Sequence, residues 1–96
     1  MKRKPAVANA FYYGSPARLE DQVAALVDEH LERKEAMGVV SPHAGFMYSG
    51  IVAGAVYSRV KLPGTLILLG PNHTGYGAPA AIMAEGSWEM PFGAVE

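Results

Sequence analysis

Two short apolar runs, each followed by a turn that carries a histidine, constrain the fold of this chain most strongly. The first run, at residues 37–40, leads into Ser-Pro-His-Ala-Gly at 41–45. The second run, at 65–69, leads into Gly-Pro-Asn-His-Thr-Gly at 70–75. The second run, bounded by Gly and Pro, is typical of a strand buried on both faces of a parallel sheet. The first run is too short to classify by its periodicity alone, and the helical spacing that follows it supports a strand there. The pattern therefore predicts two strands, with His43 just after the first and His73 just after the second.

The segment between the two runs has the spacing of a helix. Its apolar residues recur at helical intervals over 48–60; they are Ile51, Val52, Ala55, Val56 and Val60. Gly50 and Gly54 keep one side of this helix small, which favours close packing of the helix on a sheet. Leu-Pro-Gly at 62–64 ends it. Strand, helix and strand then form a βαβ unit, which is right-handed in about 98% of cases.

The N-terminal part predicts an extended lead-in followed by another helix. Ser15 as N-cap and Pro16 at the first helical position start the helix. A single apolar stripe continues it until it fades at 34–36; the stripe consists of Leu19, Val23, Leu26, Val27 and Leu31. His30 lies beside this stripe, and we interpret it as a surface residue. Phe-Tyr-Tyr at 11–13 either packs on the domain or lines a pocket.

The βαβ topology gives the histidine pair its chemical interest. Ligands of parallel sheets bind outside the carboxyl ends of the strands, and neighbouring strands lie about 4.8 Å apart. His43 and His73 can therefore converge on one divalent transition metal, or one of them can act as a general acid or base beside it. For either histidine taken alone, capping a helix or hydrogen-bonding a turn is the interpretation we prefer. A phosphate loop is disfavoured because Tyr76 stands where that motif needs lysine.

Length and composition exclude several other classes of protein. The 96 residues make one small domain at most, and the absence of cysteine excludes disulfides and zinc–thiolate clusters within the chain. A formal net charge of −1 gives no basic surface for nucleic acid or an anionic membrane. The longest apolar runs are too short to span a bilayer, and we expect a cytoplasmic protein.

Four ordered blocks resemble the Memo-like proteins, which include the AmmeMemoRadiSam system protein B group. Pro-His-Ala-Gly-Phe at 42–46 and Leu-Gly-Pro-Asn-His-Thr at 69–74 resemble the two signature motifs of this family. Residues 6–12 and the Trp-x-x-Pro-x-Gly block at 88–93 resemble two further segments. Asn9 replaces a family glycine, and because Asn tolerates positive φ better than most residues, we expect the turn there to survive.

The resemblance implies an α/β fold with a partly parallel sheet and flanking helices, similar to class III extradiol dioxygenases. It also implies that His43 and His73 bind a metal, iron or copper in preference to zinc, with a third ligand much further along the chain. Family members are much longer, so we expect residues 1–96 to be the N-terminal portion of a single Memo-like domain, truncated as it enters a strand at 93–96.

Two functions of different classes follow from this resemblance. The first is a metal-dependent oxidation resembling that of the extradiol dioxygenases, with Tyr48 and Asn72 orienting the substrate. The second is a signalling protein that binds a peptide or a small molecule in the same crevice without turnover. Unpaired sheet edges would favour a homo-oligomer in either case.

Overall fold

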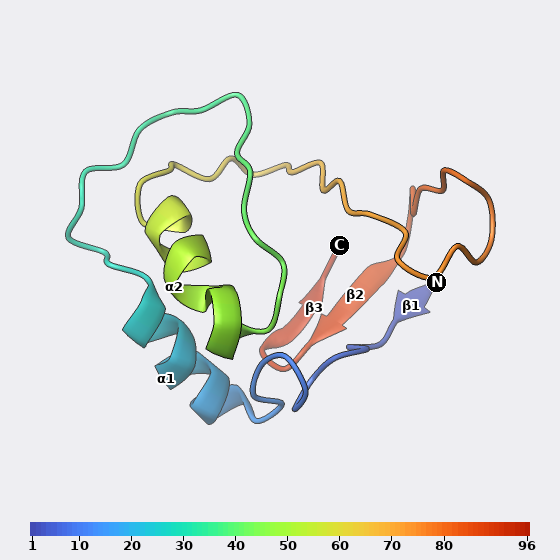
Figure 1. Ribbon diagram of the computed structural model, residues 1–96, viewed down its shortest axis with the longest axis horizontal. Helices are drawn as coiled ribbons and strands as arrows, with labels where there is room; N and C mark the ends of the chain where they lie inside the picture. Colours follow the sequence, from blue (N-terminus) through green and yellow to red (C-terminus); the bar gives the residue numbers. More distant parts are fainter.

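Two helices packed on each other lie beside a small three-stranded sheet in the computed structural model, which describes residues 1–96 (Figure 1). Helix α1 (Pro16–Leu26) starts as expected, with Ser15 as N-cap and proline in the first turn. Helix α2 (Phe46–Tyr57) starts directly after the first histidine turn. In Figure 1 a long irregular segment leads from the end of α2 across the molecule to the sheet.

Helix α1 ends earlier than its apolar stripe predicted. It stops at Leu26, and Val27 already has extended dihedral angles (φ −103°, ψ 123°). After this point the backbone N–H groups bond to side chains and not to helical carbonyls. The Ser58 hydroxyl accepts the N–H of Asp28 at 2.8 Å, and the Asp28 carboxylate accepts the N–H of His30 at 2.9 Å. Such bonds compete with helical ones, so the predicted continuation of the helix to 34–36 is wrong.

The two helices meet where α2 has no side chains. A Cβ on Gly50 would lie 2.8 Å from Leu26 Cδ1, and a Cβ on Gly54 would collide with the carbonyl group of Leu26. The glycines therefore do permit close packing, but against α1 and not against a sheet as predicted. Ser58 continues this face of α2, and its hydroxyl donates to the carbonyl of Gly54 at 2.6 Å.

The sheet is built from the two ends of the chain. Strand β1 (Lys2–Arg3) pairs in parallel with β2 (Ser87–Met90), which pairs antiparallel with β3 (Gly93–Val95) in the order β1-β2-β3. The Arg3 guanidinium lies 4.7 Å from the Trp88 ring centroid, a cation–π contact across the parallel pair. The α/β class and a partly parallel sheet are thereby confirmed, although the parallel pair is not the predicted one.

The predicted strands at 37–40 and 65–69 do not form strands in this structure. Only one parallel bridge flanks α2: the N–H of Lys34 donates to the carbonyl of Arg59, and the N–H of Lys61 donates to the carbonyl of Lys34, both at 2.9 Å. Backbone–backbone hydrogen bonds are absent from both predicted runs. A strand needs a pairing partner, so the apolar pattern alone does not produce one.

The N-terminal turn packs on the beginning of α2. Asn9 adopts a left-handed conformation with φ of 63°, as the sequence led us to expect. The carbonyl of Phe11 accepts the N–H of Phe46 at 2.8 Å, and the rings of Tyr12 and Phe46 lie 5.8 Å apart. Tyr12 therefore packs on the domain, whereas Tyr13 is exposed and lines an open cavity beside α1 together with Arg18, so both interpretations of the 11–13 aromatic cluster hold in part. The contacts to Phe46 also anchor the end of the loop that carries His43.

Little of the apolar surface is buried. Leu19 is the one buried hydrophobic side chain, at 2% exposure, while Ile67 and Leu69 are 86% and 94% exposed. None of the helices has both the length and the hydropathy needed to cross a bilayer.

Candidate metal centre

The two signature histidines lie in direct contact although 30 residues separate them. His43 Nε2 and His73 Nε2 are 3.1 Å apart, with ring centroids at 5.2 Å and an angle of 35° between the ring planes. At this distance one ring nitrogen donates to the other, and either tautomeric arrangement satisfies the bond. The structure thus brings together the two residues that the sequence singled out, at a shared point between two irregular loops.

Each histidine is positioned by its own loop. The loop of His43 is held by the Phe46–Phe11 backbone bond and by Ser49, whose hydroxyl donates to the carbonyl of Ala44 at 3.2 Å. The loop of His73 is organised by Asn72. Its Oδ1 accepts the N–H of Gly75 at 2.9 Å, and its Nδ2 donates to the carbonyl of Tyr76 at 3.0 Å.

This Asn72-centred turn, with Gly75 at a φ of 72°, orients the segment on which His73 lies. The sequence carried a signal for it, because an Asn that precedes a glycine by three residues often closes a turn through its side chain. From the sequence we predict only a substrate function for Asn72, which misses this structural function. The substrate function of Asn72 stays a prediction.

The spacing of the two nitrogens fits a shared metal ion. Nitrogens that each lie about 2.0–2.1 Å from one ion are about 2.9 Å apart at a right angle and about 3.3 Å apart at the tetrahedral angle. The observed 3.1 Å falls between these values. A metal would replace the shared proton, because histidine ligates through a deprotonated nitrogen.

Two imidazoles are only part of a metal centre. No group of three His, Cys, Asp or Glu side chains in this structure could hold an ion. Both rings are exposed, and the contact between them is the one hydrogen bond that either side chain makes. Metal-bound histidines usually donate their second N–H to a carboxylate or a carbonyl, so these 96 residues lack both the third ligand and this supporting contact.

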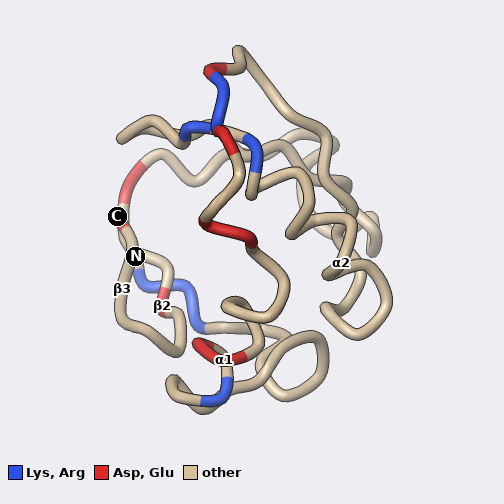
Figure 2. The backbone as a smooth tube through the Cα atoms, turned by 90° about the vertical axis from the view of Figure 1, so that its left-hand side faces the viewer, with Lys and Arg blue, Asp and Glu red and all other residues tan.

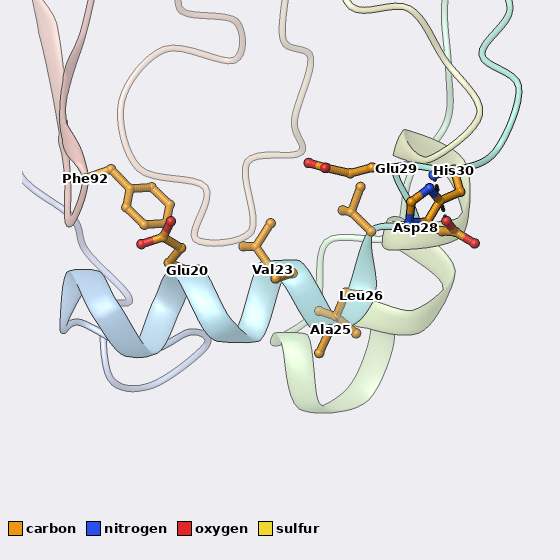
Figure 3. Close-up of a pocket in the computed structure, with 10 residues that line it drawn as sticks. Glu20, Val23, Ala25, Leu26, Asp28, Glu29, His30 and Phe92 are labelled. Carbon is orange, nitrogen blue, oxygen red and sulfur yellow. Dashed lines mark hydrogen bonds between the residues drawn. The ribbon is translucent and has the colours of Figure 1, made fainter.

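Neither Tyr48 nor His30 takes part in this contact. Tyr48 is 84% exposed on α2, and its hydroxyl makes no hydrogen bond; its substrate function stays a prediction. His30 lines a shallow cavity of about 620 Å³ along α1 together with Glu20, Val23 and Phe92 (Figure 3). That cavity includes neither His43 nor His73.

Comparison with known proteins identifies the class to which this α/β chain and its histidine pair belong. The profile of the Memo-like protein family matches residues 3–96, which is almost the whole chain. The chain therefore belongs to the Memo-like family. No solved structure matches the fold at a significant level.

Proteins from archaea and bacteria are similar to this chain in sequence. A MEMO1 family protein of Methanothermobacter thermautotrophicus is 41% identical over 108 residues, which cover 100% of this chain and 39% of the relative. A MEMO1 family protein of Pyrobaculum aerophilum is 45% identical over 106 residues, covering 98% of this chain and 38% of the relative. One from Aquifex aeolicus is 41% identical over 95 residues, covering 98% and 36%. The chain thus spans less than two fifths of the length of these curated relatives.

Proposed function

We propose that His43 and His73 are two ligands of a mononuclear transition metal site in a Memo-like protein. The observation that supports this most directly is the Nε2–Nε2 distance of 3.1 Å, which suits two ligands in neighbouring positions on one ion. Membership of the Memo-like family and the position of each histidine inside a signature motif support the same assignment.

The reaction that we propose for the complete site is a metal-dependent oxidation resembling ring cleavage by class III extradiol dioxygenases. Imidazole ligands with open positions suit iron or copper, and such a metal would supply a binding point for oxygen and substrate. In this chain, the two histidines hold the ion and the Asn72 turn fixes the segment that carries His73. Tyr48 and Asn72 are the side chains that we propose to orient the substrate.

Metal titration of single variants tests the site. We expect His43→Ala and His73→Ala each to weaken binding of Cu²⁺ or Fe²⁺ at least tenfold, because each removes one of two ligands. The matched control is His30→Ala, which removes a histidine that follows α1 and lines a cavity that includes neither His43 nor His73. Isothermal titration at pH 7.5 provides the readout. Equal affinity in all three variants would show that the pair does not ligate the ion.

Oxygen uptake tests the reaction separately from the metal. The metal-loaded protein should consume O₂ in the presence of catechol-like substrates, and this consumption should disappear in His43→Ala. Metal binding with no oxygen consumption for any such substrate would favour the other function considered from the sequence, in which the crevice binds a peptide or a small ligand without turnover.

A further inference from the structure

The two histidines lie in long stretches of the chain that contain no charged residue. His43 lies within residues 36–58 and His73 within residues 62–84, and neither stretch has a Lys, Arg, Asp or Glu. Figure 2 shows α2, which belongs to the first stretch, as uninterrupted tan tube. Metal-bound histidines are usually oriented by a carboxylate or a carbonyl. These stretches supply no carboxylate, so neutral hydrogen-bonding groups are the means they have of fixing each histidine.

Ser49 ties the residue after His43 to the beginning of α2. Its hydroxyl donates to the carbonyl of Ala44 at 3.2 Å. The carbonyl of Gly45 accepts the backbone N–H groups of Tyr48 and Ser49, at 2.9 and 3.1 Å. His43 therefore directly precedes a short segment that a side chain and the main chain together hold to the helix.

Asn72 closes the turn that contains His73. Its Oδ1 accepts the N–H of Gly75 at 2.9 Å and the hydroxyl of Thr74 at 3.3 Å. Its Nδ2 donates to the carbonyl of Tyr76 at 3.0 Å. A single side chain thus bonds to three of the four residues that follow it, and His73 is the fourth.

We propose that Ser49 and Asn72 are positioning residues, which hold the two imidazoles at metal-binding distance in the metal-free protein. This inference rests on the metal site proposed above and adds two residues that act through the backbone beside each ligand. The Nε2 atoms of His43 and His73 lie 3.1 Å apart, a separation that suits two ligands of one ion. Ligands that are held in place lose less conformational freedom on binding, so removal of either side chain should weaken metal binding.

Two measurements on alanine variants test the positioning. Ser49→Ala and Asn72→Ala should each weaken Cu²⁺ binding about tenfold, the lower end of the cost of losing a residue that supports a metal ligand. In the metal-free chain, the nuclear Overhauser contact between the carbon-bound ring protons of His43 and His73 should weaken in both variants. Substrate is left out of these titrations, so the substrate function proposed for Asn72 does not affect them.

Two further variants separate positioning from a general loss of stability. Ser58→Ala removes a hydroxyl at the other end of α2, which donates to the carbonyl of Gly54 at 2.6 Å. Once Cu²⁺ affinity is corrected for the folded fraction by circular dichroism, this variant should stay within about twofold of the unsubstituted chain, because distant sites act independently. Ser49→Thr keeps the hydroxyl and should restore the affinity that Ser49→Ala loses.

Glycine substitutions test the Asn72 turn without removing a polar side chain. Gly75 has a φ of 72°, where a residue with a Cβ is strained, whereas the φ of Gly70 lies outside this region. Nothing lies within 4 Å of a Cβ at either position. Gly75→Ala should therefore weaken Cu²⁺ binding as Asn72→Ala does, and Gly70→Ala should leave it unchanged.

The possible results distinguish this inference from the metal site on which it rests. Unchanged affinity in Ser49→Ala and Asn72→Ala, with His43→Ala and His73→Ala still weakened, overturns the positioning and leaves the metal site in place. A loss in Ser58→Ala equal to theirs also overturns it, because stability alone would then explain the losses. If the unsubstituted chain binds no Cu²⁺, the metal site is refuted. The ring contact then decides the positioning, which is supported if the contact weakens in both alanine variants and overturned if it does not.

Discussion

The positive φ at position 9 is an angle that few residue types other than asparagine adopt without strain. The φ of 63° at Asn9 belongs to the left-handed region, where residues other than Gly, Asn and Asp are strained. The side chain contributes as well, because Asn9 Oδ1 accepts the N–H of Gly14 at 2.9 Å. The turn that places Phe11 against the start of α2 therefore depends on a residue that tolerates a positive φ and accepts this hydrogen bond.

Substitution at Asn9 should separate these two contributions. Asn9→Ala keeps the unfavourable angle and loses the hydrogen bond, so we expect a loss of about 1–2 kcal/mol in the stability of this turn. Asn9→Gly loses the bond but removes the strain, and its effect should be smaller. Amide exchange at Gly14 and Phe46 measures both. Equal losses for the two variants would mean that the backbone angle carries no cost.

Ser58 is a buried polar residue that links the end of α2 to the segment that follows α1. It is 1% exposed, accepts the N–H of Asp28 and donates to the carbonyl of Gly54. Ser58→Ala leaves the N–H of Asp28 without this partner, and an unsatisfied buried donor costs about 1–3 kcal/mol. Exchange of the Asp28 amide should accelerate accordingly. Ser41→Ala is the control, because the Ser41 hydroxyl makes only a 3.4 Å contact to its neighbour and should change little.

At the scale of the elements, the contact between α1 and α2 is the one helix packing in the molecule. It depends on the absence of side chains at Gly50 and Gly54, both of which face Leu26. The atom that a Cβ at Gly54 would meet is a backbone carbonyl, which cannot rotate away as a flexible side chain can. The helices would have to move apart.

We therefore expect Gly54→Ala to destabilise the helix pair by about 1–3 kcal/mol, the usual cost of overpacking, even though alanine favours helix formation. Circular dichroism at 222 nm during urea titration measures the loss. Gly38→Ala is the control: nothing lies within 4 Å of a Cβ at this position, so its effect should be within about 0.5 kcal/mol. A stabilised Gly54→Ala variant would contradict the close approach of the two helices.

Across the whole molecule, exposure of apolar side chains outweighs burial. With Leu19 as the one buried hydrophobic residue, the core supplies little of the free energy that must offset chain entropy. Unfolding in urea should therefore be broad, with an m-value below the 1–3 kcal/mol/M that is typical of small proteins. The exposed surfaces should also bind the dye ANS and cause self-association that increases with concentration.

Sedimentation velocity at several concentrations, together with ANS fluorescence, checks this prediction. Leu68→Asp should lower both signals, since Leu68 is 69% exposed within the apolar run. A monomer that unfolds cooperatively, with no dye binding, would show that the chain is more stable than its buried surface indicates.

The sequence by itself determined the features that depend on local chemistry and on motifs. The Ser15–Pro16 signal gives the start of α1, the tolerance of Asn for positive φ gives the conformation at Asn9, and the recurring histidine turns identify the residues that meet. The family followed from the same motifs. All of these are set by residues close together in the chain, or by motifs whose order the sequence displays.

Only the tertiary structure decided what depends on a partner. The hydroxyl of Ser58 bonds to Asp28 across 30 residues of sequence, at the point where α1 gives way to a turn. The glycines of α2 pack on α1 because Leu26 lies against them. No local sequence pattern indicates which surface the glycines contact. The runs at 37–40 and 65–69 have the composition of strands but no neighbouring strand, while Lys2 and Arg3 become a strand because β2 pairs with them. A strand is defined by its hydrogen-bonded neighbour, and that neighbour is supplied by the fold.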